Sequence, residues 1–325
     1  MRFSKSSLAS LFVAASLAVA TVPAWAQAKK VTVTQAFQSM LYLPLYVAID
    51  QGFFKQQGLD VTKENAGSPT AALSAVLSGS AQFSVHGPEW TAIAASKGAK
   101  VGIISNVVNG AAVYIATTPD FHYDGVKSLK GQKVVTGLMP TTSTSLFMKL
   151  LKENGMNPDK DVDMIQVQTG SEAGPFLGGQ AKVAVLYEPG LDQVAAQGMK
   201  VVLGFPKQYG AYAFSSVTAR SDVDPDAAQR LVNGMELALR FMQKNHDQTL
   251  QIALKEFPTL DPKVVTNAVN RMLADNVYPK SVETSAEAFK TGMDTQIALG
   301  NLKAQPDYAT FVVPTYVKKA LALPQ

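Results

Sequence analysis

The stretch Gly67–Trp90, GSPTAALSAVLSGSAQFSVHGPEW, contains a helix, a strand and a polar loop, and it predicts the class of the fold. Ser68 and Pro69 are typical of a helix start, because the serine side chain caps free N–H groups and the proline has no N–H to satisfy. Gly79 is typical of the left-handed residue that ends a helix. A short apolar strand follows and leads into the loop His86–Trp90. In an open α/β sheet, ligands bind at loops that leave the carboxyl ends of strands, so we expect a ligand site here.

The same alternation of β-branched strands, helices and glycine or proline turns occurs twice along the chain. The expected strands lie at 31–34, 59–62, 83–85 and 101–108, and then at 133–136, 162–167, 182–186 and 200–203. Such alternation is typical of parallel sheets covered by helices on both faces. Two further β-prone segments, 111–117 and 211–219, predict crossings between the two series. We therefore expect an α/β protein of two lobes, with two mostly parallel sheets flanked by helices and two crossover segments.

The first 26 residues have the pattern of a cleaved signal peptide. A basic start with Arg2 and Lys5 precedes an apolar run at 8–22 and the small-residue motif Ala24–Ala26. Cleavage after this motif would leave 299 residues with a formal charge of +2. In the exported chain we expect residues 27–115 to form the first part of lobe 1, 116–208 to form lobe 2, and 209–325 to return to lobe 1.

Composition narrows the possible functions. The chain has no cysteine, which excludes disulfides, cysteine-based metal sites, thiol chemistry and a lipid-modified cysteine anchor. The formal charge of +4 is spread over scattered lysines without a basic stripe, so nucleic acid is not an expected partner. We expect no cofactor, no metal and no catalytic residue.

Several motifs spread over most of the exported chain resemble, in the same order, the periplasmic solute-binding proteins of ABC importers. They are Leu43–Ala48 (LPLYVA), Gln51–Phe54 (QGFF), Gly58–Val61 (GLDV), Leu77–Phe83 (LSGSAQF), Leu129–Val134 (LKGQKV) and Ala184–Pro189 (AVLYEP). The chain is most similar to the branch that handles sulfonates, taurine, nitrate and the pyrimidine precursors of thiamine. The resemblance implies a type II two-lobed fold that holds a small solute between its lobes. It also implies a monomer, free in the periplasm, that delivers the solute to an inner-membrane ABC permease with its ATPase.

Matching the loops to this family implies a set of ligand-binding positions. They are Gln38, Ser39, Tyr42, His86, Gly87 and Glu89 in lobe 1, Thr141, Thr142, Ser143, Tyr187 and Glu188 in lobe 2, and Tyr212 on the return crossing. Each position has a structural alternative. The Thr/Ser run is also typical of a helix cap, the tyrosines of packing at a hinge, and Glu188 of a carboxylate at a helix N-terminus.

Two features of these loops favour different solutes. The helix start at Thr142 and Ser143 has the N–H groups that bind anions, which favours a sulfonate, taurine, nitrate or an aromatic carboxylate. However, all arginines of the exported chain come at position 220 or later, outside the expected site loops. Glu89 and Glu188 match amines and ring N–H groups instead, and Trp90 and the tyrosines match flat rings. We favour a nitrogen heterocycle such as an aminopyrimidine.

Proteins of two other classes fit parts of the same pattern. In a cleft enzyme of thiamine-pyrimidine metabolism, His86, Glu89 and Glu188 would act as acid and base. The cysteine-rich motif of the related eukaryotic enzymes is absent, so we predict that the protein is not an enzyme. A periplasmic sensor that docks on a receptor would have the same fold and site, and neighbouring genes for a permease and an ATPase would distinguish it from an importer.

Overall fold

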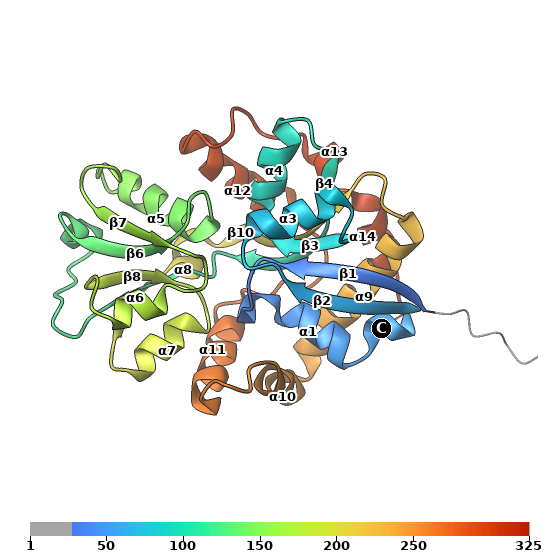
Figure 1. Ribbon diagram of the computed structural model, residues 1–325, viewed down its shortest axis with the longest axis horizontal. Helices are drawn as coiled ribbons and strands as arrows, with labels where there is room; N and C mark the ends of the chain where they lie inside the picture. Colours follow the sequence, from blue (N-terminus) through green and yellow to red (C-terminus); the bar gives the residue numbers. More distant parts are fainter. Residues whose placement is uncertain (1–27, 325) are drawn as a thin grey trace, which may run out of the picture.

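A computed structural model describes residues 28–324 and shows two α/β lobes, each built on one five-stranded sheet (Figure 1). The predicted signal peptide, residues 1–26, lies outside the described residues. Within the described range no helix is both long enough and apolar enough to cross a bilayer. The predicted two-lobed α/β architecture is confirmed.

The sheet of lobe 1 has the strand order β2-β1-β3-β10-β4. β1 pairs in parallel with β2 and β3, whereas β10 runs antiparallel to β3 and β4. The strands are β1 (Lys29–Gln35), β2 (Leu59–Asn65), β3 (Phe83–His86), β4 (Val101–Gly110) and β10 (Ala211–Arg220).

The sheet of lobe 2 repeats this plan with the order β7-β6-β8-β5-β9. β6 pairs in parallel with β7 and β8, and β5 runs antiparallel to β8 and β9. The strands are β5 (Tyr114–Thr117), β6 (Lys133–Gly137), β7 (Asp163–Val167), β8 (Val183–Leu186) and β9 (Lys200–Gly204). In each sheet the reversed strand is the one that enters by a crossing, so the sheets are mixed but mostly parallel.

The first crossing falls slightly earlier than the expected lobe boundary between residues 115 and 116, whereas the expected second boundary, between 208 and 209, lies within the second crossing. β5 begins at Tyr114, so Tyr114 and Ile115 pair in the sheet of lobe 2 although we expected them in lobe 1. The first crossing is the short segment 111–113, which is completely buried. The second crossing contains α8 (Phe205–Tyr209), and β10 then returns the chain to the first sheet.

Helices cover both faces of the sheets. Ile103 and Ile104 are neighbours on β4 but belong to different apolar clusters, because successive side chains of a strand point to opposite faces. In lobe 1 the helices are η1 (Met40–Tyr42), α1 (Leu43–Asp50), α2 (Phe53–Gln56), α3 (Pro69–Ser78), α4 (Pro88–Ser96), α9 (Pro225–Lys244), α10 (His246–Glu256), α11 (Pro262–Ala274), α12 (Ala286–Ala298), α13 (Tyr308–Phe311) and α14 (Pro314–Leu321). In lobe 2 they are η2 (Val126–Leu129), α5 (Thr142–Glu153), α6 (Ala173–Leu177) and α7 (Gly190–Ala196).

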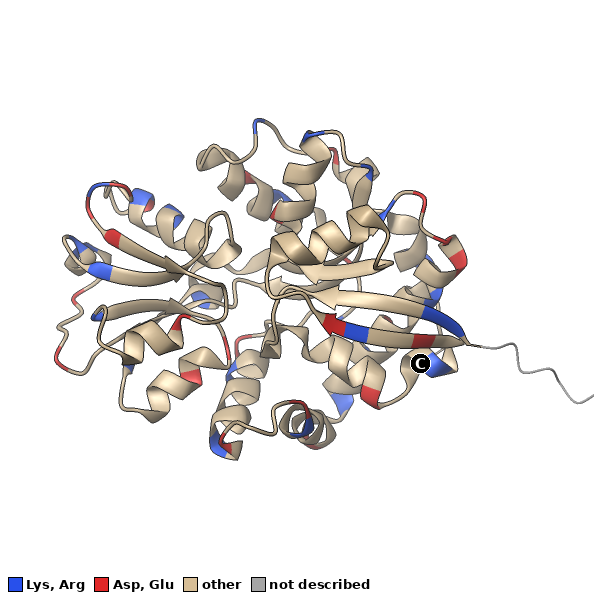
Figure 2. Cartoon of the chain, in the orientation of Figure 1, with Lys and Arg blue, Asp and Glu red and all other residues tan. Residues whose placement is uncertain are grey.

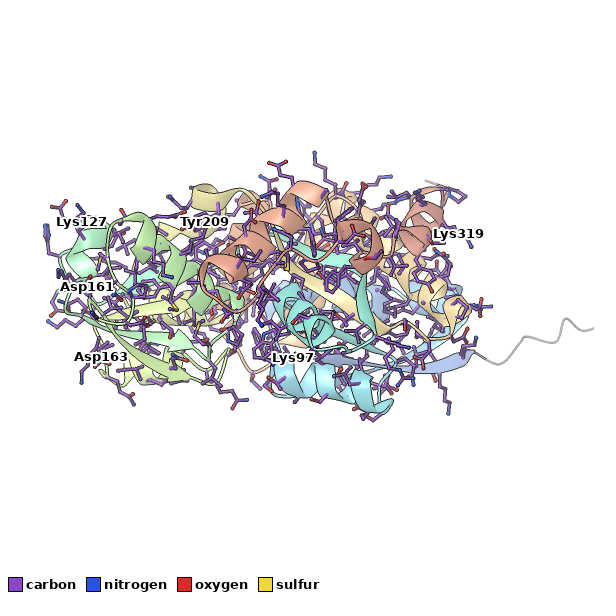
Figure 3. All side chains as sticks on the ribbon, turned by 90° about the horizontal axis from the view of Figure 1, so that it is seen from above. Lys97, Lys127, Asp161, Asp163, Tyr209 and Lys319 are labelled. Atoms are coloured by element: carbon purple, nitrogen blue, oxygen red, sulfur yellow. The ribbon has the colours of Figure 1, made fainter. Side chains whose placement is uncertain are left out.

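Charged residues of both signs occur on both lobes. Figure 2 shows Lys and Arg interspersed with Asp and Glu. Seen from above in Figure 3, the lobes lie side by side, with Lys127 and Asp161 at the outer end of lobe 2 and Lys319 at the far end of lobe 1.

The unit that predicted the fold has the expected local structure. The Ser68 hydroxyl oxygen accepts a hydrogen bond from the Ala71 N–H at 3.1 Å, and Gly79 ends α3 with φ +85°. One feature differs: α4 begins at Pro88, earlier than expected from the sequence, because Gly87 serves as its N-cap and Pro88 suits the first turn. Glu89 therefore lies in the first turn of a helix rather than in a free loop.

Lobe 1 is closely packed around Gly234, so a substitution at this position tests the packing. A Cβ at this position in α9 would overlap the ring of Phe54, whereas one at Gly292 in α12 would meet Ala213 O at an ordinary 3.4 Å. We expect Gly234→Ala to lower the free energy of unfolding by about 1–3 kcal/mol through overpacking. Gly292→Ala is the control and should be neutral or up to about 1 kcal/mol stabilising, because alanine favours a helix. Urea titration followed by circular dichroism measures both, and equal effects would contradict the packing argument.

Candidate functional site

The candidate site is a small cavity between the lobes. Its volume is about 20 Å³, which is room for about one water molecule. A solute larger than water therefore requires the lobes to move apart or the lining side chains to shift. Lobe 1 contributes Phe37, Leu41, Tyr42, Pro69, Gly87, Glu89, Phe214 and Ser215, and lobe 2 contributes Thr141, Thr142, Thr169 and Tyr187.

Most of these residues follow the carboxyl ends of parallel strands. Phe37 and Tyr42 follow β1, Glu89 follows β3, Thr142 follows β6 and Tyr187 follows β8. Because parallel strands of one sheet point the same way, their carboxyl ends meet at one edge. The two lobes face each other across these edges, so the topology brings the loops together.

Glu89 is the only charged residue among the described residues that line the cavity. It is 3 % exposed, and its Oε1 accepts a hydrogen bond from the Thr142 hydroxyl at 2.8 Å, which joins lobe 1 to the start of α5 in lobe 2. Burial raises the pKa of Glu89 to about 7, and the hydrogen bonds from Thr142 oppose this shift. A Cβ on Gly87 would overlap this carboxylate in its present position, so a larger residue there would displace the end of the Glu89 side chain.

Aromatic rings from both lobes pack around the same cavity. The Phe37 ring lies 5.8 Å from Tyr42 and 5.5 Å from Tyr187, and the Tyr187 ring lies 5.9 Å from Phe214, all between centroids. The Tyr187 hydroxyl accepts a hydrogen bond from the Ser143 N–H at 2.9 Å. One of the first free N–H groups of α5 is therefore already occupied by a neutral partner.

Glu188 is fully buried, but it does not line the cavity. Its carboxylate lies 2.9 Å from Arg271 Nε of α11, and Arg271 Nη2 lies 2.8 Å from Asp192 Oδ1. Arg271 belongs to lobe 1, whereas Glu188 and Asp192 belong to lobe 2. Burial and the nearby Asp192 raise the pKa of Glu188, and the Arg271 charge opposes this shift. The sequence could not show this pairing, because the partners are 83 residues apart.

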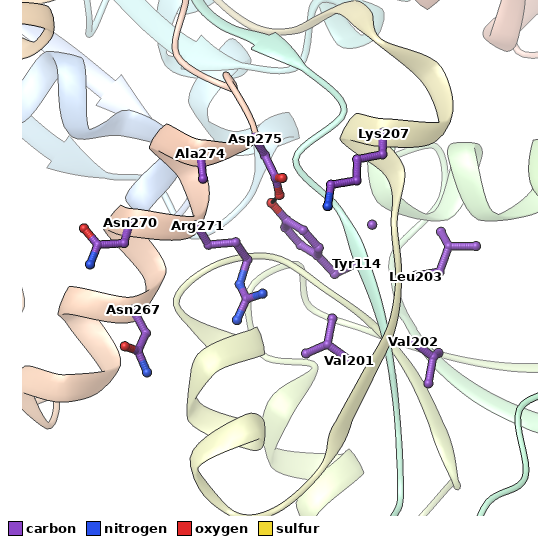
Figure 4. Close-up of a pocket in the computed structure, with 11 residues that line it drawn as sticks. Tyr114, Val201, Val202, Leu203, Lys207, Asn267, Asn270, Arg271, Ala274 and Asp275 are labelled. Atoms are coloured by element: carbon purple, nitrogen blue, oxygen red, sulfur yellow. Dashed lines mark hydrogen bonds between the residues drawn. The ribbon is translucent and has the colours of Figure 1, made fainter.

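A larger groove of about 680 Å³ lies beside this ion network, between β9 and α11 (Figure 4). Tyr114 donates a hydrogen bond from its hydroxyl to Asp275 Oδ2 at 2.7 Å across it. Lys207 and Arg271 also line the groove. It is separate from the cavity, because the two share no lining residue.

The His86 ring is hydrogen-bonded to neighbouring groups of the protein and does not line the cavity. Its Nε2 lies 3.0 Å from the Ser84 hydroxyl and its Nδ1 lies 2.9 Å from Gly87 O, so both ring nitrogens have partners. Burial lowers the pKa of His86 to about 4. The ring is therefore neutral near pH 7, and it orients the turn that precedes α4.

Four more expected positions lie outside the cavity lining. Gln38 is exposed and donates to Glu256 O at 3.0 Å. Ser39 donates from its hydroxyl to Glu188 O at 2.6 Å, a contact between the lobes. Ser143 contributes its backbone N–H to Tyr187, and the Tyr212 ring packs edge-on against Phe214 at 6.2 Å.

The structure thus brings together about half of the expected positions. The ones that line the cavity are Tyr42, Gly87, Glu89, Thr141, Thr142 and Tyr187. The lining residues that sequence reasoning missed are Phe37, Leu41, Pro69, Thr169, Phe214 and Ser215. Phe37 and Leu41 lie in a loop that we had identified, whereas Thr169 follows β7, whose loop we had not considered. Within residues 28–324, no group of three His, Asp or Glu side chains is placed to hold a metal.

Residues 40–249 match the model of the protein family described as NMT1/THI5 like. The chain belongs to this family. It is also 24 % identical, over 82 % of its length and 83 % of the relative, to the putative binding protein YtlA of Bacillus subtilis (strain 168).

Solved structures of several proteins have the same two-lobed fold. The periplasmic nitrate-binding protein NrtA from Synechocystis PCC 6803 has a TM-score of 0.76 at 16 % identity, covering 92 % of this chain and 90 % of NrtA. The alkanesulfonate-binding protein SsuA from Xanthomonas axonopodis pv. citri, bound to MOPS, has a TM-score of 0.71 at 15 % identity, covering 91 % and 98 %. The desulfurization enzyme DSZB has a TM-score of 0.67 at 12 % identity, covering 89 % and 98 %. At these identities the likeness shows the fold alone.

We expect the stability contributed by Glu89 to fall as pH rises. Below about pH 4.5 the folded and unfolded states both hold the proton, whereas between 4.5 and about 7 only the folded state keeps it. Ionisation in the closed protein therefore costs up to about 3 kcal/mol. Between pH 5 and 8, the free energy of unfolding of Glu89→Gln should rise relative to that of the wild type. The lowered pKa of His86 makes stability rise with pH in both proteins, so this contribution cancels in the difference between them. Urea titrations at each pH measure both proteins, with the exposed Asp163→Asn as the control. A difference in unfolding free energy between Glu89→Gln and the wild type that does not change with pH would contradict the prediction.

Removing Arg271 should separate the lobes. Arg271→Met leaves Glu188 and Asp192 without a cation, and because Arg271 is partly exposed we expect a loss of roughly 1–3 kcal/mol, between the values for surface and buried pairs. Small-angle X-ray scattering should then show a larger radius of gyration. Arg240→Met is the control, since Arg240 pairs with Glu236 inside lobe 1. An unchanged radius in Arg271→Met would show that the network does not hold the lobes together.

Proposed function

We propose that this protein is the periplasmic solute-binding component of an ABC importer, and that its solute is a small amine-bearing or cationic nitrogen heterocycle such as an aminopyrimidine. The observation that carries the solute class is the cavity lining, in which the Glu89 carboxylate is buried among aromatic rings. Among the described residues of this lining there is no lysine, arginine or histidine. An amine or ring N–H would donate to Glu89 and keep its charge paired on closure.

The aromatic rings favour a flat solute. Phe37, Tyr187 and Phe214 form a continuous set of tilted and edge-on contacts that spans both lobes. Opening of the lobes would part Phe37 from Tyr187, and a planar ring entering there would regain contact with both. A cation near these ring faces gains further electrostatic attraction.

Solute capture then follows from closure of the lobes. The solute favours the closed form only through contacts that it makes with both lobes and loses in the open form. Glu89 and Phe37 supply such contacts from lobe 1, and Thr142 and Tyr187 supply them from lobe 2. A micromolar solute needs about 8 kcal/mol of net binding free energy, which a stacked ring with a few charge-assisted hydrogen bonds can provide. The closed protein would present both lobes to the permease together.

A second solute class, anions, is favoured by the position of α5. Its N-terminus faces the cavity and already binds the Glu89 carboxylate through Thr142, so a sulfonate, nitrate or carboxylate could take the place of that carboxylate. NrtA and SsuA are named for such anions. Displacing Glu89 would leave its charge unpaired in the cavity, and for that reason we favour the amine-bearing solute.

Tryptophan fluorescence and calorimetry test the proposal. Trp90 follows Glu89 directly, and it is the only tryptophan after the predicted signal peptide. The exported form is titrated with 4-aminopyrimidine, taurine, an alkanesulfonate, nitrate and benzoate. We expect the aminopyrimidine to bind in the micromolar range, to change the fluorescence and to remain chemically unaltered. Tight binding of an anion without response to the heterocycle would refute the solute class, and turnover would indicate an enzyme.

Glu89→Gln distinguishes the two solute classes by the sign of its effect. Loss of one charge-assisted hydrogen bond should weaken an amine-bearing solute about 10- to 100-fold. The same change should strengthen an anion, because it removes a competing carboxylate from α5. Isothermal titration calorimetry measures both, with Asp163→Asn as the control, since Asp163 is exposed on lobe 2 and outside the cavity lining.

A further inference from the structure

A groove on lobe 1 lies apart from the solute cavity and from the groove beside the ion network. It runs between the C-terminal half of α4 and the segment 300–307, which connects α12 to α13 (Figure 1). Its volume is about 760 Å³, within the range of about 300–1,000 Å³ that is usual for small-molecule sites. It shares no lining residue with either of the other two spaces. We call it the α4 groove.

The two walls of the α4 groove are fixed independently of each other. Hydrogen bonds attach the segment 300–307 to α12: the Asn301 N–H donates to Gln296 O at 2.9 Å, and the Gln305 side-chain amide donates to Asp294 Oδ1 at 2.6 Å. Within the part of the chain that the structure describes, no hydrogen bond joins this segment to α4. The groove is therefore already formed before any ligand enters, as is usual for small-molecule sites.

Buried apolar side chains form the floor of the α4 groove. They are Ala92 of α4, Val101 at the start of β4, Leu302 of the connecting segment and Phe311 of α13. Ala92, Leu302 and Phe311 belong to the apolar cluster that covers one face of the sheet of lobe 1. An alkyl chain that replaces water over this floor gains the hydrophobic free energy of burial.

Two lysines lie at the edge of the same groove. Lys97, the C-cap of α4, and Lys303 are both exposed, and neither makes an ion pair or a side-chain hydrogen bond with another described residue. The acidic lining residue, Asp307, accepts a hydrogen bond from the Ala309 N–H at 3.3 Å as the N-cap of α13. Two lysines and one aspartate give the lining a formal charge of +1. An anionic group at this edge would complement that charge.

We propose that the α4 groove is a second small-molecule site, and that its ligand is a single-chain amphiphile with an anionic head, such as an alkyl carboxylate. The alkyl chain lies over the apolar floor, and the head lies between Lys97 and Lys303. An amine with the same chain would meet two like charges, whereas a short acid would leave the floor uncovered. The site goes beyond the proposed function and does not depend on it, because none of its residues lines the solute cavity.

Isothermal titration calorimetry of the exported form with octanoate tests the site, and acetate and octylamine serve as matched probes. Octanoate should bind at least about tenfold more tightly than acetate, because each buried methylene adds to the hydrophobic gain. It should also bind more tightly than octylamine. Lys97→Gln combined with Lys303→Gln should weaken octanoate by about 2- to 20-fold, since each exposed ion pair contributes modestly. Ala95→Phe places a ring in the groove from its half-buried wall and should weaken octanoate more than about tenfold.

A matched control and two further measurements separate the possible outcomes. Lys127→Gln combined with Lys133→Gln removes the same charge from the exposed surface of lobe 2 and should leave the octanoate affinity unchanged. An affinity that responds to Glu89→Gln but not to Ala95→Phe would place octanoate in the solute cavity and overturn the proposal. Sedimentation equilibrium tests the other occupant: a dimer that Ala95→Phe dissociates would show that a second copy of the chain covers the groove.

The lysine pair keeps the proposal testable on its own. Unfolding midpoints verify that each variant is folded, and if Ala95→Phe is not, the comparison of the two double lysine variants decides. Equal octanoate affinities in these two variants, or octylamine binding as tightly as octanoate, would refute the site. The proposed function would stand in each of these cases, because its solute binds elsewhere.

Discussion

The burial of one carboxylate between the lobes is the constraint on which the rest of the site depends. Glu89 is held in the first turn of α4, where the helix N-terminus favours a negative charge, and it reaches across to Thr142 at the start of α5. A carboxylate in this position stabilises the closed form only while it is hydrogen-bonded or paired. Closure, the protonation of Glu89 and the charge of the solute are therefore linked in a single equilibrium.

The lobes also meet at contacts that involve no cavity residue. Arg271 of lobe 1 pairs with Glu188 and Asp192 of lobe 2, and Gln168 of lobe 2 donates to Gly67 O of lobe 1. The crossing at 111–113 is buried within the core cluster that both lobes share. These contacts lower the free energy of the closed form whether or not a solute is bound. The solute then has to supply only the remaining difference between the open and closed forms.

Local signals predicted the strands and helix starts well, because residues such as Ser68 and Gly79 act through hydrogen bonds and backbone angles within one turn. The loops that follow parallel strands could also be located, since topology brings strand ends together. Which carboxylate faces the cavity could not be predicted. Glu188 looked as suitable as Glu89, but its partner Arg271 is distant in sequence.

Under the proposed function, the position of Glu89 would allow one fold to serve solutes of opposite charge. The N-terminus of α5 attracts a negative group through its free N–H groups. When lobe 1 brings a carboxylate to that point, the hydrogen-bond donors at the start of α5 are paired with a side chain of the protein itself. The cavity then presents a hydrogen-bond acceptor to the solute instead of a donor. In a protein without an acidic residue after β3, the same helix start would remain free for an anion from solution. Under the proposed function, a single side chain in the first turn of α4 would be enough to reverse the charge that the cleft selects, whereas the sheets and crossings stay the same.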